Sequence, residues 1–126
     1  MSLRKKSSTM FFVLFLLGVG YVSFIFFNGK CLYIKKEISF EVNDEGFISK
    51  TLSIKRCTQV TFINTGKEMH WPASDLHPTH SIYPEFDPLE PLEPGESWSF
   101  VFDKIGNWKC HDHLTPLQRC MISVSK

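Results

Sequence analysis

All five histidines of the chain fall in two short segments, and imidazole is a common ligand of transition metals. The first segment contains His70, His77 and His80, and the second contains His111 and His113. A single histidine is most often a surface or core side chain, but five confined to two places indicate a shared site. Imidazole suits copper, zinc, iron and nickel, and the remaining ligands decide among them. The two segments are therefore a candidate metal site.

Four cysteines offer either thiolate ligands or disulfides. They are Cys31, Cys57, Cys110 and Cys120. Cys110 adjoins the second histidine segment and lies ten positions before Cys120 across a predicted hairpin loop, so it is either a thiolate ligand or the disulfide partner of Cys120. A bridge between Cys31 and Cys57 would leave the other pair to each other or to metal. Two disulfides would remove every thiolate from the site.

Short segments in which apolar and polar side chains alternate surround these residues and predict β-strands. The predicted strands are 37–43, 47–54, 60–63, 97–102, 106–110 and 121–124. Turn residues separate them, and no helical period of useful length is present beyond residue 34. This pattern predicts an all-β, antiparallel sandwich or barrel.

The segment 72–94 differs from the predicted strands because it contains six of the seven prolines. Proline cannot donate to a sheet ladder, so most of this segment is expected to be loop or edge strand. A long loop in a compact domain is usually functional. Its acidic run is interpreted as a solvated face or as a docking patch for a basic redox partner. That run consists of Glu85, Asp87, Glu90 and Glu93.

The late part of the chain resembles the copper loop of the cupredoxins. The spacing Cys110-x2-His113-x4-Gln118 matches that family's Cys-x2-His-x4-Met, with Gln118 in place of the weak axial Met. The approach to the loop is also similar, with Pro-Gly-Glu-Ser at 94–97, an alternating aromatic strand, and Gly-Asn-Trp at 106–108.

The upstream histidine of that family follows a strand, and two histidines match its place. His70 has the expected spacing from the preceding strand, and His80 matches equally well after a ten-residue insertion. His80 is slightly preferred. Counting forward from Gly106 places Asp112 rather than Cys110 at the thiolate position.

The resemblance covers residues 35–126 and implies a cupredoxin-like antiparallel Greek-key β-sandwich that binds copper. One alternative is a type-1-like centre for electron transfer, in which Cys110 supplies a thiolate and Gln118 a weak axial oxygen. Another is a copper or zinc site of histidines alone, suited to copper handling, in which the cysteines pair with each other. A third is a metal-free sandwich that binds other proteins. The candidate metal ligands are His70, His80, Cys110, His111 and His113.

The N-terminal part predicts a membrane anchor. Residues 1–9 form a basic tail, and residues 10–27 carry no charge over a length of about 27 Å, close to the hydrocarbon thickness of a bilayer. A cleaved signal peptide is the alternative, but the apolar run continues beyond the small residues that would precede cleavage. The basic tail is expected in the cytoplasm, 10–27 as a transmembrane signal anchor, 28–34 as a linker, and 35–126 outside the cytoplasm.

The charge of the expected external part excludes one class of function. Counted with the linker, from residue 28 to 126, it contains 11 Lys and Arg against 13 Asp and Glu, a net of −2, which is unlike a nucleic-acid surface. No Ser-His-Asp order, paired-carboxylate pocket or phosphate-cradling glycine loop is visible, so we expect a non-enzyme. The expected partners are the membrane and a redox or copper-trafficking protein, and the expected location is the cell membrane, with a periplasmic or extracellular domain.

Overall fold

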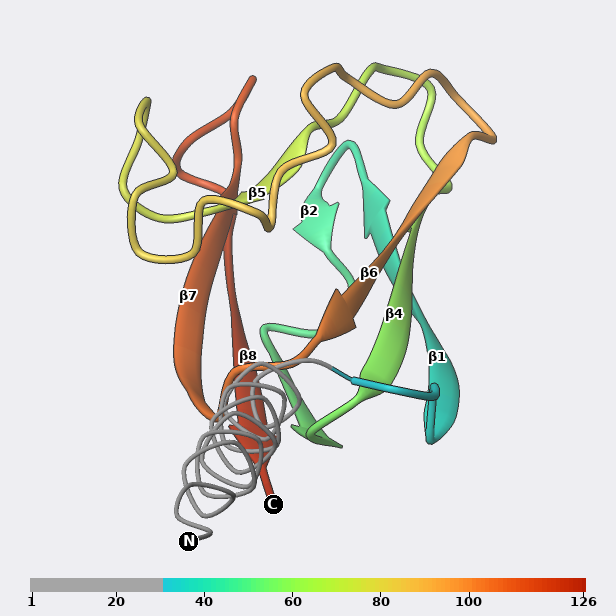
Figure 1. The fold of residues 1–126 in the computed structure, drawn as a ribbon. Helices are drawn as coiled ribbons and strands as arrows, with labels where there is room; N and C mark the ends of the chain where they lie inside the picture. Colours follow the sequence, from blue (N-terminus) through green and yellow to red (C-terminus); the bar gives the residue numbers. More distant parts are fainter. Residues whose placement is uncertain (1–30) are drawn as a thin grey trace, which may run out of the picture. The chain divides into compact units, whose positions relative to one another are not determined.

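The computed structural model describes residues 31–126, and this part of the chain consists of eight β-strands joined by loops (Figure 1). The strands are β1 (Lys36–Asn43), β2 (Gly46–Phe47), β3 (Thr51–Lys55), β4 (Thr58–Asn64), β5 (Pro72–Ser74), β6 (Ser97–Phe102), β7 (Gly106–Asp112) and β8 (Arg119–Ser125). Within residues 31–126 there is no helix that could span a bilayer. The predicted tail, anchor and first linker residues lie outside the described part.

The strands form two four-stranded sheets, in the orders β2-β1-β4-β6 and β3-β8-β7-β5. The two sheets face each other as a sandwich, which confirms the all-β expectation (Figure 1). The expectation of purely antiparallel pairing was wrong, because β1 pairs with β4 and β3 with β8 in parallel. After β2 the chain crosses to the other sheet to form β3. It then returns to the first sheet as β4, which lies beside β1 and runs in the same direction. A hairpin cannot produce such a parallel pair.

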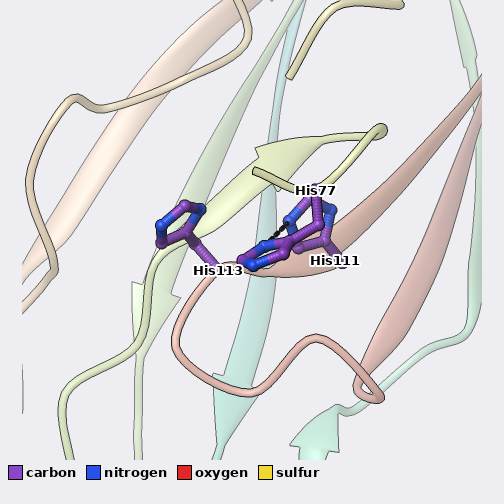
Figure 2. A group of neighbouring side chains, drawn as sticks. All are labelled: His77, His111 and His113. Carbon is purple, nitrogen blue, oxygen red and sulfur yellow. Dashed lines mark hydrogen bonds between the residues drawn. The ribbon is translucent and has the colours of Figure 1, made fainter. Parts of the chain in front are cut away.

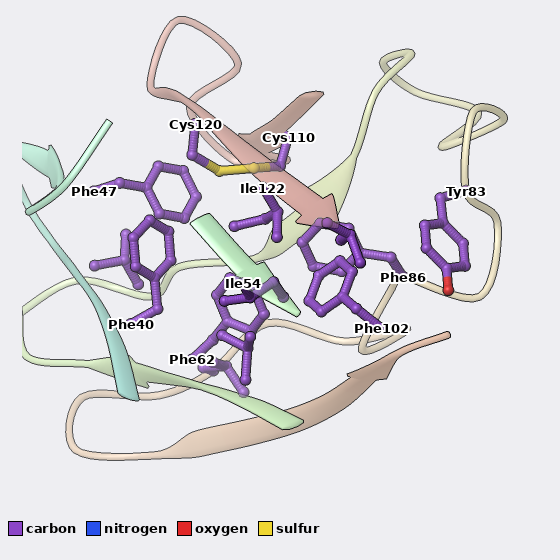
Figure 3. Packing of buried hydrophobic residues seen from close by; sticks show 14 residues of the cluster. Phe40, Phe47, Ile54, Phe62, Tyr83, Phe86, Phe102, Cys110, Cys120 and Ile122 are labelled. Carbon is purple, nitrogen blue, oxygen red and sulfur yellow. A yellow bond between two sulfur atoms is a disulfide. The ribbon is translucent and has the colours of Figure 1, made fainter. Parts of the chain in front are cut away.

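The core fills the space between the sheets and follows from the alternation of the strands. In β4, Val60 and Phe62 are buried and the residues between them face outward, as expected for a strand with one buried face. Figure 3 shows aromatic side chains of β1, β2, β4 and β6 meeting Ile54 and Ile122 of the opposite sheet in this layer. Phe62 is 5.7 Å from Phe40 and 5.2 Å from Phe86 between ring centroids.

Residues 31–126 contain two disulfides. Cys31 pairs with Cys57, at the turn between β3 and β4. Cys110 and Cys120 lie directly opposite each other on β7 and β8 and are bonded. Both sulfur-bearing residues of this second bridge belong to the core, as the yellow bond in Figure 3 shows.

The segment between β5 and β6, residues 75–96, passes from one sheet to the other, and we call it the crossover loop. In Figure 1 it is the yellow-to-orange trace that leaves β5 and reaches β6. Tyr83 and Phe86 are 1% and 0% exposed, so the loop is tied to the core. The Tyr83 hydroxyl also donates a hydrogen bond to the Asp103 carboxylate. A loop fixed at two points can hold its other side chains in place against the sheet.

Candidate metal centre

Three histidines place ligand atoms close together at the end of β7. His77, His111 and His113 offer nitrogens that all lie within 4.8 Å of one another. His111 ends the outward face of β7, His113 follows the strand, and His77 comes from the crossover loop (Figure 2). Residues 34 positions apart in the sequence are therefore joined by the way the crossover loop folds over β7.

A fourth histidine, His80, completes the group. Its Nε2 lies 2.8 Å from Nδ1 of His113. Its ring centroid is 4.8 Å from that of His113 and 5.4 Å from that of His111. The ring of His77 is 4.7 Å from His113 and 5.3 Å from His111. Each histidine of the crossover loop thus contacts both histidines of the β7 end, and we call these four residues the histidine centre.

Two carboxylates determine which nitrogens of the histidine centre point inward. Nδ1 of His111 donates to Asp75 Oδ1 at 2.8 Å, and Nδ1 of His80 donates to Asp87 Oδ2 at 2.5 Å. The Nε2 atoms of His111 and His80 are therefore left as bare acceptors. Carboxylates that hold the outer nitrogen of a histidine are the usual support of metal ligands, because they orient the ring and raise its basicity.

The spacing of the inward nitrogens suits a metal ion. Nε2 of His111 is 3.3 Å from Nδ1 of His77. Two nitrogens bound at ordinary metal distances in a tetrahedral site are about 3.3 Å apart. Without metal, His77 and His113 donate hydrogen bonds to the bare nitrogens, so no buried imidazole nitrogen is left unsatisfied.

Further contacts hold the carboxylates themselves. Asp75 accepts a second bond at Oδ2 from the Arg119 guanidinium, at 3.0 Å. Asp87 accepts one at Oδ1 from the Trp71 indole, at 2.8 Å. The Trp71 ring also packs on the ring of His113, with 4.6 Å between centroids. The histidine centre therefore has a supporting layer on two sides.

Burial keeps two of the imidazoles neutral. Burial lowers the pKa of His111 below its usual value, although the Asp75 carboxylate opposes part of the shift. Burial and the neighbouring His80 and His77 imidazoles lower the pKa of His113. A neutral imidazole is the form that binds metal. At pH 7 these two side chains are therefore ready to act as ligands.

The charge of Asp87 is stabilised by its hydrogen bonds. Burial raises the pKa of this carboxyl, but the bonds from His80, the Leu89 amide and the Trp71 indole outweigh it, so the pKa lies below the usual value. The acidic run was interpreted as a solvated face or a docking patch, but Asp87 instead faces inward and supports His80.

The structure separates His70 from the histidine centre. Its Nδ1 lies 2.6 Å from Asp112 Oδ2, and its Nε2 lies 3.4 Å from Asp44 Oδ1. Asp112 also accepts the amides of Trp71 and Leu114 through Oδ1. His70 therefore joins three loops at the end of the sandwich, and the histidine centre forms without it.

Cys110 does not supply a thiolate in this structure, so the type-1-like alternative is not the arrangement observed. Its sulfur is bonded to Cys120. Successive side chains of a strand point to opposite faces, so Cys110 points into the core while His111 points outward under the crossover loop. Gln118, expected as the axial ligand, instead directs its amide to the backbone oxygen of Asp44 at 3.0 Å.

The donors that remain are those of a nitrogen-only site. Four imidazoles with two supporting carboxylates suit Cu(II) or Zn(II), whereas a blue-copper centre needs a thiolate. The resemblance to cupredoxins implies copper. In this chain copper would fit only through histidine ligands.

The histidine centre draws on both histidine segments of the sequence, but His77 was not among the candidate ligands. Although Pro78 lies between them, a loop brings His77 and His80 to the centre without a helix. Asp75 and Asp87 were also not expected to support ligands. The short spacing of Asp75, His77 and His80 in the sequence could have indicated these roles, because one loop can contribute both metal ligands and a carboxylate that supports them.

The structure is similar to solved structures of a cupredoxin and of amicyanin. A structure described as a novel purple cupredoxin from Nitrosopumilus maritimus matches with a TM-score of 0.61 at 22% identity, covering 70% of this chain and 99% of that one. A Cu(I) amicyanin mutant matches with a TM-score of 0.61 at 18% identity, covering 71% and 82%. A reduced Cu(I) form of another amicyanin mutant, at pH 4, matches with 0.59 at 17%, covering 76% and 85%. No protein-family model and no curated protein matches the sequence. These likenesses concern the fold and confirm the expected two-sheet architecture.

Proposed function

We propose that this chain, a β-sandwich with the cupredoxin-like fold, binds one copper ion at the histidine centre and serves in copper handling. The observation that carries the proposal is the group of three imidazoles, His77, His111 and His113, whose ligand nitrogens lie within 4.8 Å of one another, with His80 in hydrogen-bond contact with His113 beside them. Two of these imidazoles are held by Asp75 and Asp87 so that their Nε2 atoms face inward. Zinc is the alternative metal, because the same donors suit it.

Differences in exposure among the ligands favour capture and release of the ion. His80 and His111 are 5% and 0% exposed, whereas His77 is exposed and His113 is half-buried. The two buried imidazoles would anchor the metal, and the two accessible ones would exchange with ligands of a partner. Such a partner would be a copper-trafficking protein or a redox protein.

Electron transfer is the second candidate function, and the fold favours it. A site made only of nitrogens lacks the thiolate of type-1 centres, so we rank this role below copper handling. The alternative from a different class is a metal-free sandwich that binds other proteins. In that case the imidazoles would serve only to pack the crossover loop on β7.

The proposed setting is the outer side of a cell membrane, with residues 10–27 as the anchor. The two disulfides support this location, because disulfides persist outside the cytoplasm and are rare inside it. We further propose that the protein is not an enzyme. The support is the donor set, in which His77 and His80 each contact His111 and His113, and the two carboxylates are occupied by His80, His111, Trp71 and Arg119.

Titration of the full chain with Cu(II) tests the proposal. Binding would be followed by quenching of tryptophan fluorescence, since Trp71 packs on His113, and the complex by visible absorption and electron paramagnetic resonance. We expect one equivalent of Cu(II) with nitrogen hyperfine structure and without an intense thiolate band. His111→Ala should abolish stoichiometric binding. His70→Gln is the matched control and should retain it.

Three results would contradict the proposal. Absence of stoichiometric binding would favour the metal-free interaction module. An intense thiolate-to-copper band that disappears in Cys110→Ser would establish the type-1-like alternative. Loss of binding in His70→Gln with unchanged binding in His111→Ala would place the metal elsewhere. A parallel titration with Zn(II) in competition decides which metal is preferred.

A further inference from the structure

The outward face of the sheet that carries His111 is cationic. The outward side chains of β3, β7 and β8 include Lys55, Lys109 and Arg119, and these strands place no carboxylate there. By contrast, β1 of the opposite sheet directs Glu37 and Glu41 outward. The positive charge therefore gathers on the sheet that carries His111, and negative charge on the opposite sheet.

A pocket of about 540 Å³ lies in this cationic face, beside the supporting layer of the histidine centre. Its polar lining comes from Lys50, Thr51, Asp75, Lys109 and Arg119, and Met121 forms part of its apolar floor. The lining, which also includes Cys110 and Cys120, contains three cations and one carboxylate. That carboxylate, Asp75, is only 6% exposed and is already bonded to His111 and Arg119.

The cations of the pocket have unused hydrogen-bond donors. Arg119 is 56% exposed and uses its Nη1 for Asp75, out of five donors on a guanidinium. Among residues 31–126, Lys50 and Lys109 take part in no salt bridge. Lys109 lies opposite Met121, one diagonal step from Arg119 on the same face. A small oxyanion between them would accept charge-assisted bonds from both.

Asp75 joins this pocket to the histidine centre. Its Oδ1 accepts a hydrogen bond from His111 Nδ1, and its Oδ2 accepts one from Nη1 of Arg119. A change in the charge around Arg119 therefore changes how strongly Asp75 supports a metal ligand.

We propose that the pocket is a binding site for a small oxyanion, and that Asp75 couples its occupancy to metal binding at the histidine centre. The coupling rests on the proposed metal binding, whereas the anion site does not. An anion that shares Arg119 leaves more of the Asp75 charge for His111, which raises the basicity of its Nε2. The two ligands therefore strengthen each other, and the effect is reciprocal.

The anion site is tested first on the metal-free full chain, with sulfate as the probe. Sodium sulfate is compared with sodium chloride at matched ionic strength by amide chemical shifts. We expect saturable shifts at residues 109, 119 and 121. Arg119→Gln and Lys109→Gln should each abolish saturation. Lys55→Gln, on the same face but outside the pocket, is the matched control and should not change it. Shifts that do not saturate, or that persist in both pocket variants, would overturn the site.

The coupling is tested by Zn(II) and Cu(II) titrations with saturating sulfate and with matched chloride. We expect sulfate to tighten metal binding about fivefold, at the lower end of the range for coupled sites. Asp75→Asn should still bind sulfate but lose the tightening. Equal metal affinity in both salts would overturn the coupling. Sulfate binding by a chain that binds no metal would leave the anion site standing and would refute the proposed copper function instead.

Discussion

At the scale of single residues, Asp87 does more for the histidine centre than any other carboxylate. It orients His80 directly, and it orients His113 through Trp71, whose indole it binds and whose ring covers that imidazole. We therefore expect Asp87→Asn to weaken Cu(II) binding about 10–100-fold, the usual effect of losing such support. Competition against a chelating indicator measures the affinity.

Glu90→Gln is the control for Asp87→Asn, because Glu90 belongs to the same loop and no hydrogen bond or salt bridge of its side chain is found among residues 31–126. It should leave the metal affinity unchanged. The resonance parameters of bound Cu(II) should change in Asp87→Asn and stay constant in the control. Equal affinities in both variants would show that Asp87 only packs the loop.

Asp44 gives a pH-dependent prediction away from the metal. Hydrogen bonds from the amides of Glu68 and Lys67 lower the pKa of this carboxyl. A lowered pKa in the folded state stabilises the protein at pH above about 4, and the contribution is lost as the pH falls through the folded value. Asp44→Asn should therefore unfold at lower urea than the wild type at pH 7, and this difference should shrink below pH 4. With Glu45→Gln, the neighbouring control, no such pH-dependent difference is expected.

At the scale of elements, β7 assigns opposite roles to its two faces. Cys110 faces the core and His111 faces the histidine centre. We expect the double variant Cys110→Ala, Cys120→Ala to lose about 2–4 kcal/mol of stability, as is usual for a disulfide, while Cu(II) affinity stays within about threefold of the wild type. Urea unfolding and metal titration of the same preparation separate the two effects. Loss of copper binding by a folded double variant would show that sulfur takes part in the site.

The elements differed in how far the sequence could predict them. β1 and β4 are half-buried strands, and their period-two alternation was visible without any knowledge of the fold. β5 was hidden because Pro72 opens it and it has only three residues, although the expectation of loop or edge strand there agrees with its position at the end of a sheet. The parallel pairing of β1 with β4 depends on how the chain crosses between sheets, and alternation within one strand carries no such information.

The site was predictable to the level of segments, and only in part to the level of residues. Histidines confined to two places indicated a common site, and the structure joins those places. The choice among His70, His77 and His80 depends on the path of the crossover loop, which is set by the burial of Tyr83 and Phe86 in the core. Spacing alone cannot supply such a three-dimensional constraint.

At the scale of the whole described domain, the crossover loop joins the two sheets, and the histidine centre lies where that loop meets β7. Its histidines, His77 and His80, contact those of the β7 end, His111 and His113. A bound metal would therefore act as a clamp between a loop and a sheet. The sandwich core has support of its own from the Cys110–Cys120 disulfide, whose two residues both belong to it.

Metal should consequently stabilise the crossover loop more than the sheets. At free Cu(II) or Zn(II) of 100 times the dissociation constant, binding adds about 2.7 kcal/mol to the free energy of unfolding. Hydrogen exchange should then slow mainly at amides of residues 76–82, because local opening of the loop now requires release of the ion. Some amides of β1 and β4 exchange only by global unfolding. Their exchange should slow only by the factor that corresponds to the added free energy of unfolding. His77→Ala should lose the extra protection of the loop. Exchange of this variant and of the wild type without metal is the reference, because the variant also lacks the hydrogen bond from His77 to His111. If metal slows exchange in the loop and in the sheets by the same factor, and by less than the global stabilisation predicts, the metal binds outside the crossover loop.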